Sequence, residues 1–118
     1  FGLLGHSFEM AQGSNCSIHI QAQNIPYHAE ALELASMGLV PAGAYRNREF
    51  TKGGVRFADS VPLAMQDILY DPQTSGGLLI ALPAHEAQAC LQQLQEVVPE
   101  SAIVGHVTQR QDAWIIVE

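Results

Sequence analysis

Residues 16–22 read C-S-I-H-I-Q-A, with an apolar side chain at every second position from Cys16 onward. This alternation predicts a β-strand with one face in the core. On either side of the strand apolar residues recur at helical spacing, which predicts helices over 3–12 and 28–37. Gly38 then closes the second of these helices as a left-handed cap.

The second half of the chain continues this mixed order. A helix is predicted over 61–69, and the clearest amphipathic helix follows over 84–97. Residues 78–82 form a continuous apolar run, which is typical of a strand buried on both faces. Two further strands, over 102–108 and 113–117, are predicted to be joined by a hairpin turn.

Helices and strands in this mixed order predict an α+β fold, a two-layer domain with helices packed on one face of a mixed β-sheet. The 118 residues are enough for a single domain over 1–118 with its own core. The chain opens on Phe1 with no initiator Met and no basic leader. We therefore expect a fragment of a longer protein, and the cytoplasm is the default location for a chain without targeting signals.

Composition and charge exclude several classes of protein. Hydrophobic residues make up 47% of the chain and charged residues 14%, which excludes intrinsic disorder. No apolar run approaches the roughly 20 residues of a membrane span. The formal net charge of −7 argues against nucleic-acid binding, which requires a basic surface.

A basic cluster lies within a stretch that we expect to be irregular, from Pro41 to about residue 58. With Glu49 as the only acidic residue among them, the cluster comprises Arg46, Arg48, Lys52 and Arg56. A local cationic patch on an acidic domain suits a small anion. The alternative is a solvated loop whose cations pair with neighbouring carboxylates.

Two glycine-containing segments add backbone donors that an anion could use. D-P-Q-T-S-G-G at 71–77 can form a nest of N–H groups with two hydroxyls, or it can be only a tight turn. F-G-L-L-G-H at 1–6 begins a helix, whose free N–H groups can hold phosphate, or its glycines can serve only close packing. The histidines show no metal-ligand spacing, and neither Cys16 nor Cys90 has an activating neighbour. We therefore assign no catalytic residue and no metal ligand.

Four motifs together resemble one family. F-G-L-L-G-H at 1–6, Y-R-N at 45–47, D-P-Q-T-S-G-G-L at 71–78 and I-V-G-H-V at 103–107 resemble, in order, the motifs of the C-terminal half of selenophosphate synthetase (selenide, water dikinase). The resemblance spans nearly the whole chain. The wider superfamily includes aminoimidazole ribonucleotide synthetase, and the resemblance implies the fold of that enzyme's C-terminal domain.

The resemblance implies an ATP-dependent phosphotransferase that makes selenophosphate, AMP and phosphate from ATP, selenide and water. Its catalytic Cys or selenocysteine, its essential Lys and its ATP and Mg²⁺ sites belong to an N-terminal domain absent here, and so does the T-D-V-T-G stretch that precedes F-G-L-L-G-H. The fragment is thus expected to be inactive alone and to bind no cofactor tightly. Its supporting phosphate- or nucleotide-binding residues would be Gly2, Arg46, Asn47, Thr74, Ser75, Gly76 and Gly77.

The expected partners are the missing N-terminal ATP-binding domain and small-molecule anions, with a homodimer at full length and neither nucleic acid nor membrane. Without its partner domain, the fragment is expected to expose an apolar or glycine-rich face near 1–8 and 71–78 that favours self-association. Two alternatives stay open. The chain could belong to another enzyme of the superfamily, in purine biosynthesis or hydrogenase maturation, or be a non-catalytic partner-binding module.

Overall fold

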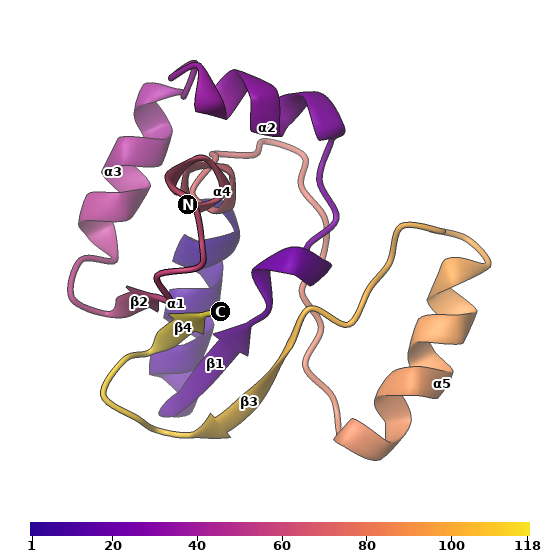
Figure 1. Cartoon of the computed structure of the whole chain (residues 1–118). Coiled ribbons are helices and arrows are strands. Elements are labelled where there is room, and N and C mark those ends of the chain that lie inside the picture. Colours follow the sequence, from indigo (N-terminus) through magenta and orange to yellow (C-terminus); the bar gives the residue numbers. More distant parts are fainter.

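The structure, a computed structural model, describes all residues from 1 to 118. Helices and strands are mixed along the chain, as the sequence predicts (Figure 1). The helical elements are α1 (Gly2–Ser14), the short 3-10 helix η1 (Ala22–Asn24), α2 (Ala29–Ser36), α3 (Ala42–Phe50), α4 (Leu63–Leu69) and α5 (Ala84–Gln95). The strands are β1 (Cys16–Ile20), β2 (Val55–Phe57), β3 (Gly105–Gln109) and β4 (Ile115–Val117).

The strands form one mixed sheet in the order β2-β4-β1-β3. Strand β4 is parallel to both β1 and β2, whereas β3 is antiparallel to β1. Ile18 pairs with Ile115 and Ile20 pairs with Val117, so these four side chains point to the same face. Helix α1 packs on that face, and α3 and α4 pack on α1 (Figure 1). The predicted α+β fold, with helices on one face of a mixed sheet, is confirmed.

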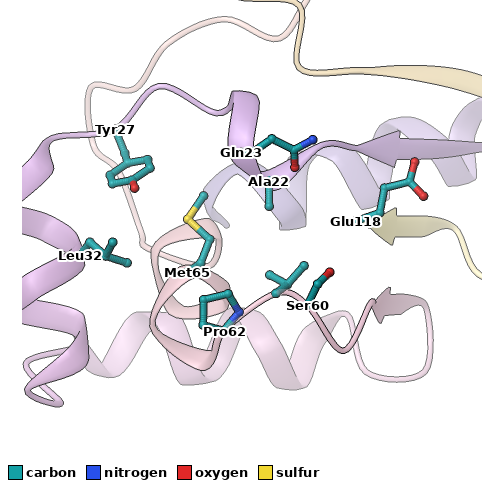
Figure 2. A pocket seen from close by; sticks show the side chains of 9 residues that line it. Ala22, Gln23, Tyr27, Leu32, Ser60, Pro62, Met65 and Glu118 are labelled. Atoms are coloured by element: carbon teal, nitrogen blue, oxygen red, sulfur yellow. The ribbon is translucent and has the colours of Figure 1, made fainter.

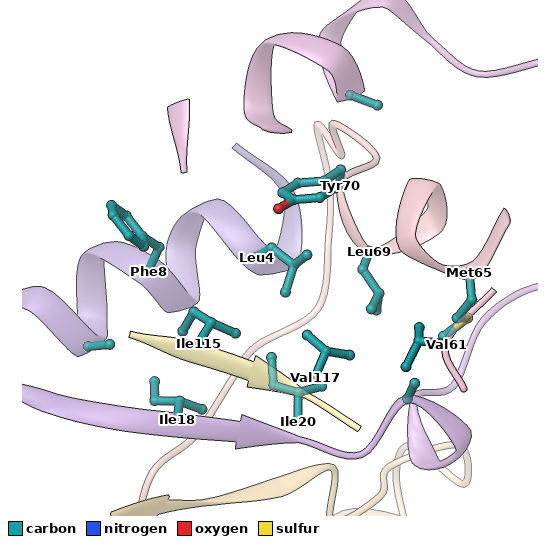
Figure 3. Close-up of a cluster of buried hydrophobic side chains, with 13 residues drawn as sticks. Leu4, Phe8, Ile18, Ile20, Val61, Met65, Leu69, Tyr70, Ile115 and Val117 are labelled. Carbon is teal, nitrogen blue, oxygen red and sulfur yellow. The ribbon is translucent and has the colours of Figure 1, made fainter. Parts of the chain in front are cut away.

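The core lies between this helical layer and the sheet (Figure 3). Leu4 of α1 and Leu69 of α4 are almost completely buried over the central strands β1 and β4. The predicted inward face of β1 is confirmed at Ile18 and Ile20, which are 5% and 1% exposed. Each such side chain contributes about 1.5–3 kcal/mol to folding through its burial.

Ser17 departs from the alternation of β1. Its side chain belongs to the polar face, yet the residue is completely buried. The hydroxyl donates to the carbonyl oxygen of Ala113 at 2.7 Å and accepts the backbone N–H of Gln111 at 2.8 Å. The segment before β4 therefore lies against the outer face of β1, where Ser17 hydrogen-bonds to two of its backbone groups.

The prediction of an irregular stretch from Pro41 to residue 58 is wrong. Pro41 is the N-cap of α3, the helix that carries the first part of the basic cluster, and β2 follows it. Pro41 and Gly43 resemble turn residues, but a proline is well tolerated where a helix begins. Gly43 lies inside the helix, where the close packing of Pro72 accounts for a residue without a side chain. A Cβ at Gly43 would lie 2.6 Å from Cγ of Pro72.

The predicted strand over 78–82 is also absent. The backbone from 72 to 82 makes no backbone hydrogen bond, and Leu78 is 92% exposed. A run of this kind needs a covering layer on both faces. Here only α5 faces the run. Helix α5 confirms the predicted amphipathic helix, but it stands apart from the sheet and none of its residues is buried (Figure 1).

The predicted hairpin between the last two strands is wrong as well. Strands β3 and β4 are not neighbours, because β1 lies between them. The connection passes the end of β1, where the guanidinium of Arg110 lies 3.7 Å from the ring centre of Trp114. Both strands exist, and only their pairing was misjudged from the sequence.

Candidate functional site

The first turn of α1 meets the start of the 71–77 segment. Gly2 is buried and has a φ of +67°, a conformation that side chains rarely adopt. A Cβ at Gly2 would lie 2.7 Å from the carbonyl oxygen of Asp71. The helix N-terminus, with its free N–H groups, is therefore placed directly against the D-P-Q-T-S-G-G motif.

Helix α3 approaches the same segment from its other side. Gly43 contacts Pro72, and the side-chain Nδ2 of Asn47 donates to the carbonyl oxygen of Tyr70 at 2.9 Å. Arg46 comes three residues after Gly43, which places it on the same side of the helix. Its side chain is exposed. Residues 70–72 thus lie between the start of α1 and the face of α3 that carries Arg46.

Two cations of the basic cluster form ion pairs with carboxylates, and two do not. Nη2 of Arg48 lies 2.7 Å from Oδ1 of Asp67, and Nζ of Lys52 lies 3.1 Å from Oε1 of Glu49. For these two residues the alternative of pairing with carboxylates is confirmed. Arg46 and Arg56 form no ion pair in the chain. Arg56 lies on β2, and its side chain points to the opposite face of that strand from Phe57, whose ring packs against Tyr70.

The glycine-rich part of the motif is open to solvent. Residues 74–77 are all exposed, and their backbone N–H groups donate to no group of the chain. No hydrogen bond joins them to Arg46 or to Gly2. The structure therefore brings together Gly2, Asn47 and Arg46 around the beginning of the motif, while the donors of 74–77 extend from it as a free turn.

Sequence reasoning missed the residues that hold this arrangement together. Gly43 and Tyr70 lie outside the quoted motifs, and Asp67 was assigned only to a helix. A glycine two residues before Y-R-N, within a helix, is the one signal in the sequence that could have pointed to a close contact. The partners of these residues, 18 or more positions away in the chain, could not be read from it.

Two cavities lie elsewhere. One, of about 280 Å³, opens between η1, α2, α4 and the end of β4 (Figure 2). Its only charged lining residue is Glu118, and its floor includes Leu32 and Met65, so it does not suit an anion. The other, of about 290 Å³, lies between Leu78 and the end of α5 and is mostly apolar. The region around Gly2, Arg46 and residues 71–76, which we call the Gly2–Arg46 surface, lines neither of these two cavities.

No group of three or more His, Cys, Asp or Glu side chains is placed to hold a metal ion. Cys16 and Cys90 are free, half-buried thiols. None of the helices combines the length and the apolar character needed to cross a membrane. The candidate site thus consists of backbone N–H donors and the exposed Arg46, groups that can bind an anion.

Comparison with known proteins gives a consistent family. Residues 1–118 match the family described as "AIR synthase related protein, C-terminal domain". Selenide, water dikinase of Treponema denticola is 43% identical over 95% of the chain and 33% of its own length. The same enzyme of Pelobacter propionicus is 45% identical over the whole chain and 34% of its own length, and selenide, water dikinase 2 of Peptoclostridium acidaminophilum is 45% identical over 99% and 34%.

The chain spans about one third of the length of these curated relatives. The match to the family description covers every element of the fold, from the helix at Gly2 to β4. The chain therefore belongs to the family of AIR synthase related C-terminal domains, and the resemblance to selenide, water dikinases drawn from its motifs is confirmed.

Proposed function

We propose that this chain is the C-terminal domain of a selenide, water dikinase, and that it binds phosphate groups of the nucleotide or of the product without supplying a catalytic residue. In this proposal the full enzyme converts ATP, selenide and water into selenophosphate, AMP and phosphate. The observation that supports it is that Gly2 of α1 approaches Asp71 while Gly43 of α3 approaches Pro72, so the chain segments of three candidate motifs lie close to one another.

Phosphoryl transfer concentrates negative charge, and enzymes catalyse it mainly by positioning and by electrostatic stabilisation. The guanidinium of Arg46 has no carboxylate partner and can bind two phosphate oxygens at once. The N–H groups at the start of α1 and in 74–77, with the hydroxyls of Thr74 and Ser75, add donors that need no proton transfer. Asn47 is the one candidate whose side-chain nitrogen already has an acceptor, the Tyr70 carbonyl.

Mg²⁺ is best held by carboxylates with water and phosphate oxygens. The segment offers only Asp71, and the chain has no cluster of three acidic or His ligands. The residues present do not fit a Mg²⁺ site, so the proposal leaves Mg²⁺, the essential Lys and the nucleophile to an N-terminal ATP-binding domain. The two domains would face each other across the Gly2–Arg46 surface in a cytoplasmic enzyme that forms a homodimer at full length.

Kinetics of the full-length enzyme test this role. Arg46→Ala should lower kcat/KM for ATP in selenide-dependent AMP formation by about tenfold or more, because a charge-assisted hydrogen bond contributes about 1.5–3 kcal/mol. Arg56→Ala is the matched control, since Arg56 is equally exposed and unpaired but lies on β2. Wild-type turnover and nucleotide affinity in Arg46→Ala would refute the role of Arg46.

A further inference from the structure

The end of α4 is held by an unusually complete set of contacts from α3. Arg48 donates from Nη2 to Oδ1 of Asp67 at 2.7 Å and from Nη1 to Oε1 of Gln66 at 3.1 Å. Its guanidinium also lies 4.7 Å from the ring centre of Tyr70. One arginine side chain therefore contacts three residues in the last turn of α4 and its C-cap.

Two residues near Arg48, Asn47 and Thr51, also contact Tyr70. Asn47 is 7% exposed, and its amide nitrogen donates to the carbonyl oxygen of Tyr70 at 2.9 Å. The hydroxyl of Thr51 lies 3.1 Å from that of Tyr70. Tyr70 is thus fixed at its ring face, its carbonyl and its hydroxyl, and the next residues are Asp71 and Pro72.

We infer that Asn47 and Arg48 are positioning residues: they clamp the end of α4 so that the 71–77 segment starts beside Gly2 and Arg46. This inference rests on the proposed function for its purpose, and it gives Asn47 a role different from that of a phosphate ligand. The segment needs such a clamp because residues 72–82 make no backbone hydrogen bond of their own. Its first two residues, Asp71 and Pro72, contact Gly2 and Gly43.

The clamp also gives two arginines of the basic cluster, Arg46 and Arg48, different roles. Arg48 is partly buried, and its ion pair with Asp67 and its hydrogen bond to Gln66 make it less available to a phosphate than Arg46. Arg46, two residues earlier, points to a different side of α3 and is exposed. One cation thus holds the helix in place while the other faces solvent beside the segment.

Backbone ¹⁵N relaxation of the 118-residue chain tests the clamp without any nucleotide. Arg48→Met should lower the order parameters of residues 73–77 and shift the amide signals of Gly2 and Gly43. Arg48→Lys keeps the ion pair with Asp67 but not the second donor, so it should fold and give an intermediate effect. Asn47→Ala should act in the same direction as Arg48→Met.

Two controls separate positioning from general loss of stability. Lys52→Met removes a cation next to the same helix whose only ion pair, with Glu49, is exposed. Ser17→Ala destabilises the far face of the sheet. Both should leave residues 73–77 unchanged. Unchanged motion of 73–77 in Arg48→Lys and Asn47→Ala, or equal motion in the Ser17→Ala control, would overturn the inference.

Binding of ATP to the full-length enzyme then tests the proposed function separately. If the segment carries phosphate donors, a clamp variant that loosens 73–77 should also raise the Kd for ATP, by about tenfold, because misplaced groups lose much of their effect. Increased motion with an unchanged Kd would leave the clamp standing and remove the anion-binding role of the segment.

Discussion

Gly43 of α3 and Pro72 of the D-P-Q-T-S-G-G segment touch so closely that a Cβ at Gly43 would lie 2.6 Å from Cγ of Pro72. These residues are 29 positions apart in the chain, and no side chain larger than hydrogen fits at position 43 without movement. The movement would fall on the segment, because it has no backbone hydrogen bonds beyond Asp71 to resist it. The contact therefore links the helix of Arg46 to the proposed phosphate donors.

Gly43→Ala should shift the segment while changing stability little. Alanine favours the helix by about 1 kcal/mol over glycine, and displacement of Pro72 offsets this gain. We expect an unfolding free energy within about 1 kcal/mol of wild type, with displaced amide signals over 72–77 and a higher Kd for ATP in the full-length enzyme. Urea denaturation, NMR and nucleotide titration measure the three quantities.

Gly13→Ala is the matched control for this substitution. Gly13 lies in the last turn of α1 with open space where its Cβ would be. It should stabilise the chain by up to about 1 kcal/mol without moving the segment. If Gly43→Ala stabilised the chain as much as Gly13→Ala and left 72–77 in place, the close contact would not exist in solution.

The sequence predicted those parts of the fold that depend on local periodicity. Alternation placed Ile18 and Ile20 on the inner face of a strand, and Gly38, with a φ of +78°, closes the preceding helical turn as expected. The sequence-based prediction failed where contacts with residues distant in the chain determine the local structure. The stretch from Pro41, which includes Gly43, is predicted to be irregular because a local pattern does not reveal the contact with Pro72. The apolar run from Leu78 predicts burial, but no second layer covers it.

The candidate site shows the same division. The motifs drew attention to Gly2, to Y-R-N and to D-P-Q-T-S-G-G, and in the structure Gly2 and Asn47 both lie beside residues 70–71. The sequence could not separate a free Arg46 from an engaged Arg48, since both look alike in a basic cluster. Only the position of Asp67 distinguishes them.

Ser17→Ala should destabilise the domain by about 1–3 kcal/mol, although serine on a polar strand face suggests a neutral substitution. The hydroxyl is the partner of both the Ala113 carbonyl and the Gln111 N–H. Its removal leaves the Gln111 N–H without an acceptor next to a buried strand, and leaves the Ala113 carbonyl with Arg110 as its only donor. Urea denaturation gives the value. Thr108→Ala, on the more exposed β3, should cost less than about 1 kcal/mol, and equal losses in both variants would show that Ser17 has no special role.

The isolated chain should self-associate through the segment that begins at Leu78. Leu78 and Ile80 are 92% and 52% exposed beside the open apolar cavity against α5. Leu78→Asp should lower the weight-average mass measured by light scattering at high concentration. Met37→Asp, at another apolar residue that is 67% exposed, should not. A wild-type chain that stays strictly monomeric at high concentration would contradict this expectation.

Tyr70 should make the fold sensitive to alkaline pH. Burial raises its pKa above the ordinary 10.0, while the Thr51 hydrogen bond and the charge of Arg48 act in the opposite direction. The folded state holds the phenol proton more tightly than the unfolded chain, so this stabilisation is complete below pH 10 and is lost as the pH rises through the folded pKa. Tyr70→Phe should flatten the fall in unfolding free energy above about pH 10, measured by urea denaturation. Tyr45→Phe, at an exposed tyrosine, should keep the wild-type slope, and an equally steep fall in Tyr70→Phe would show that the Tyr70 phenol does not govern it.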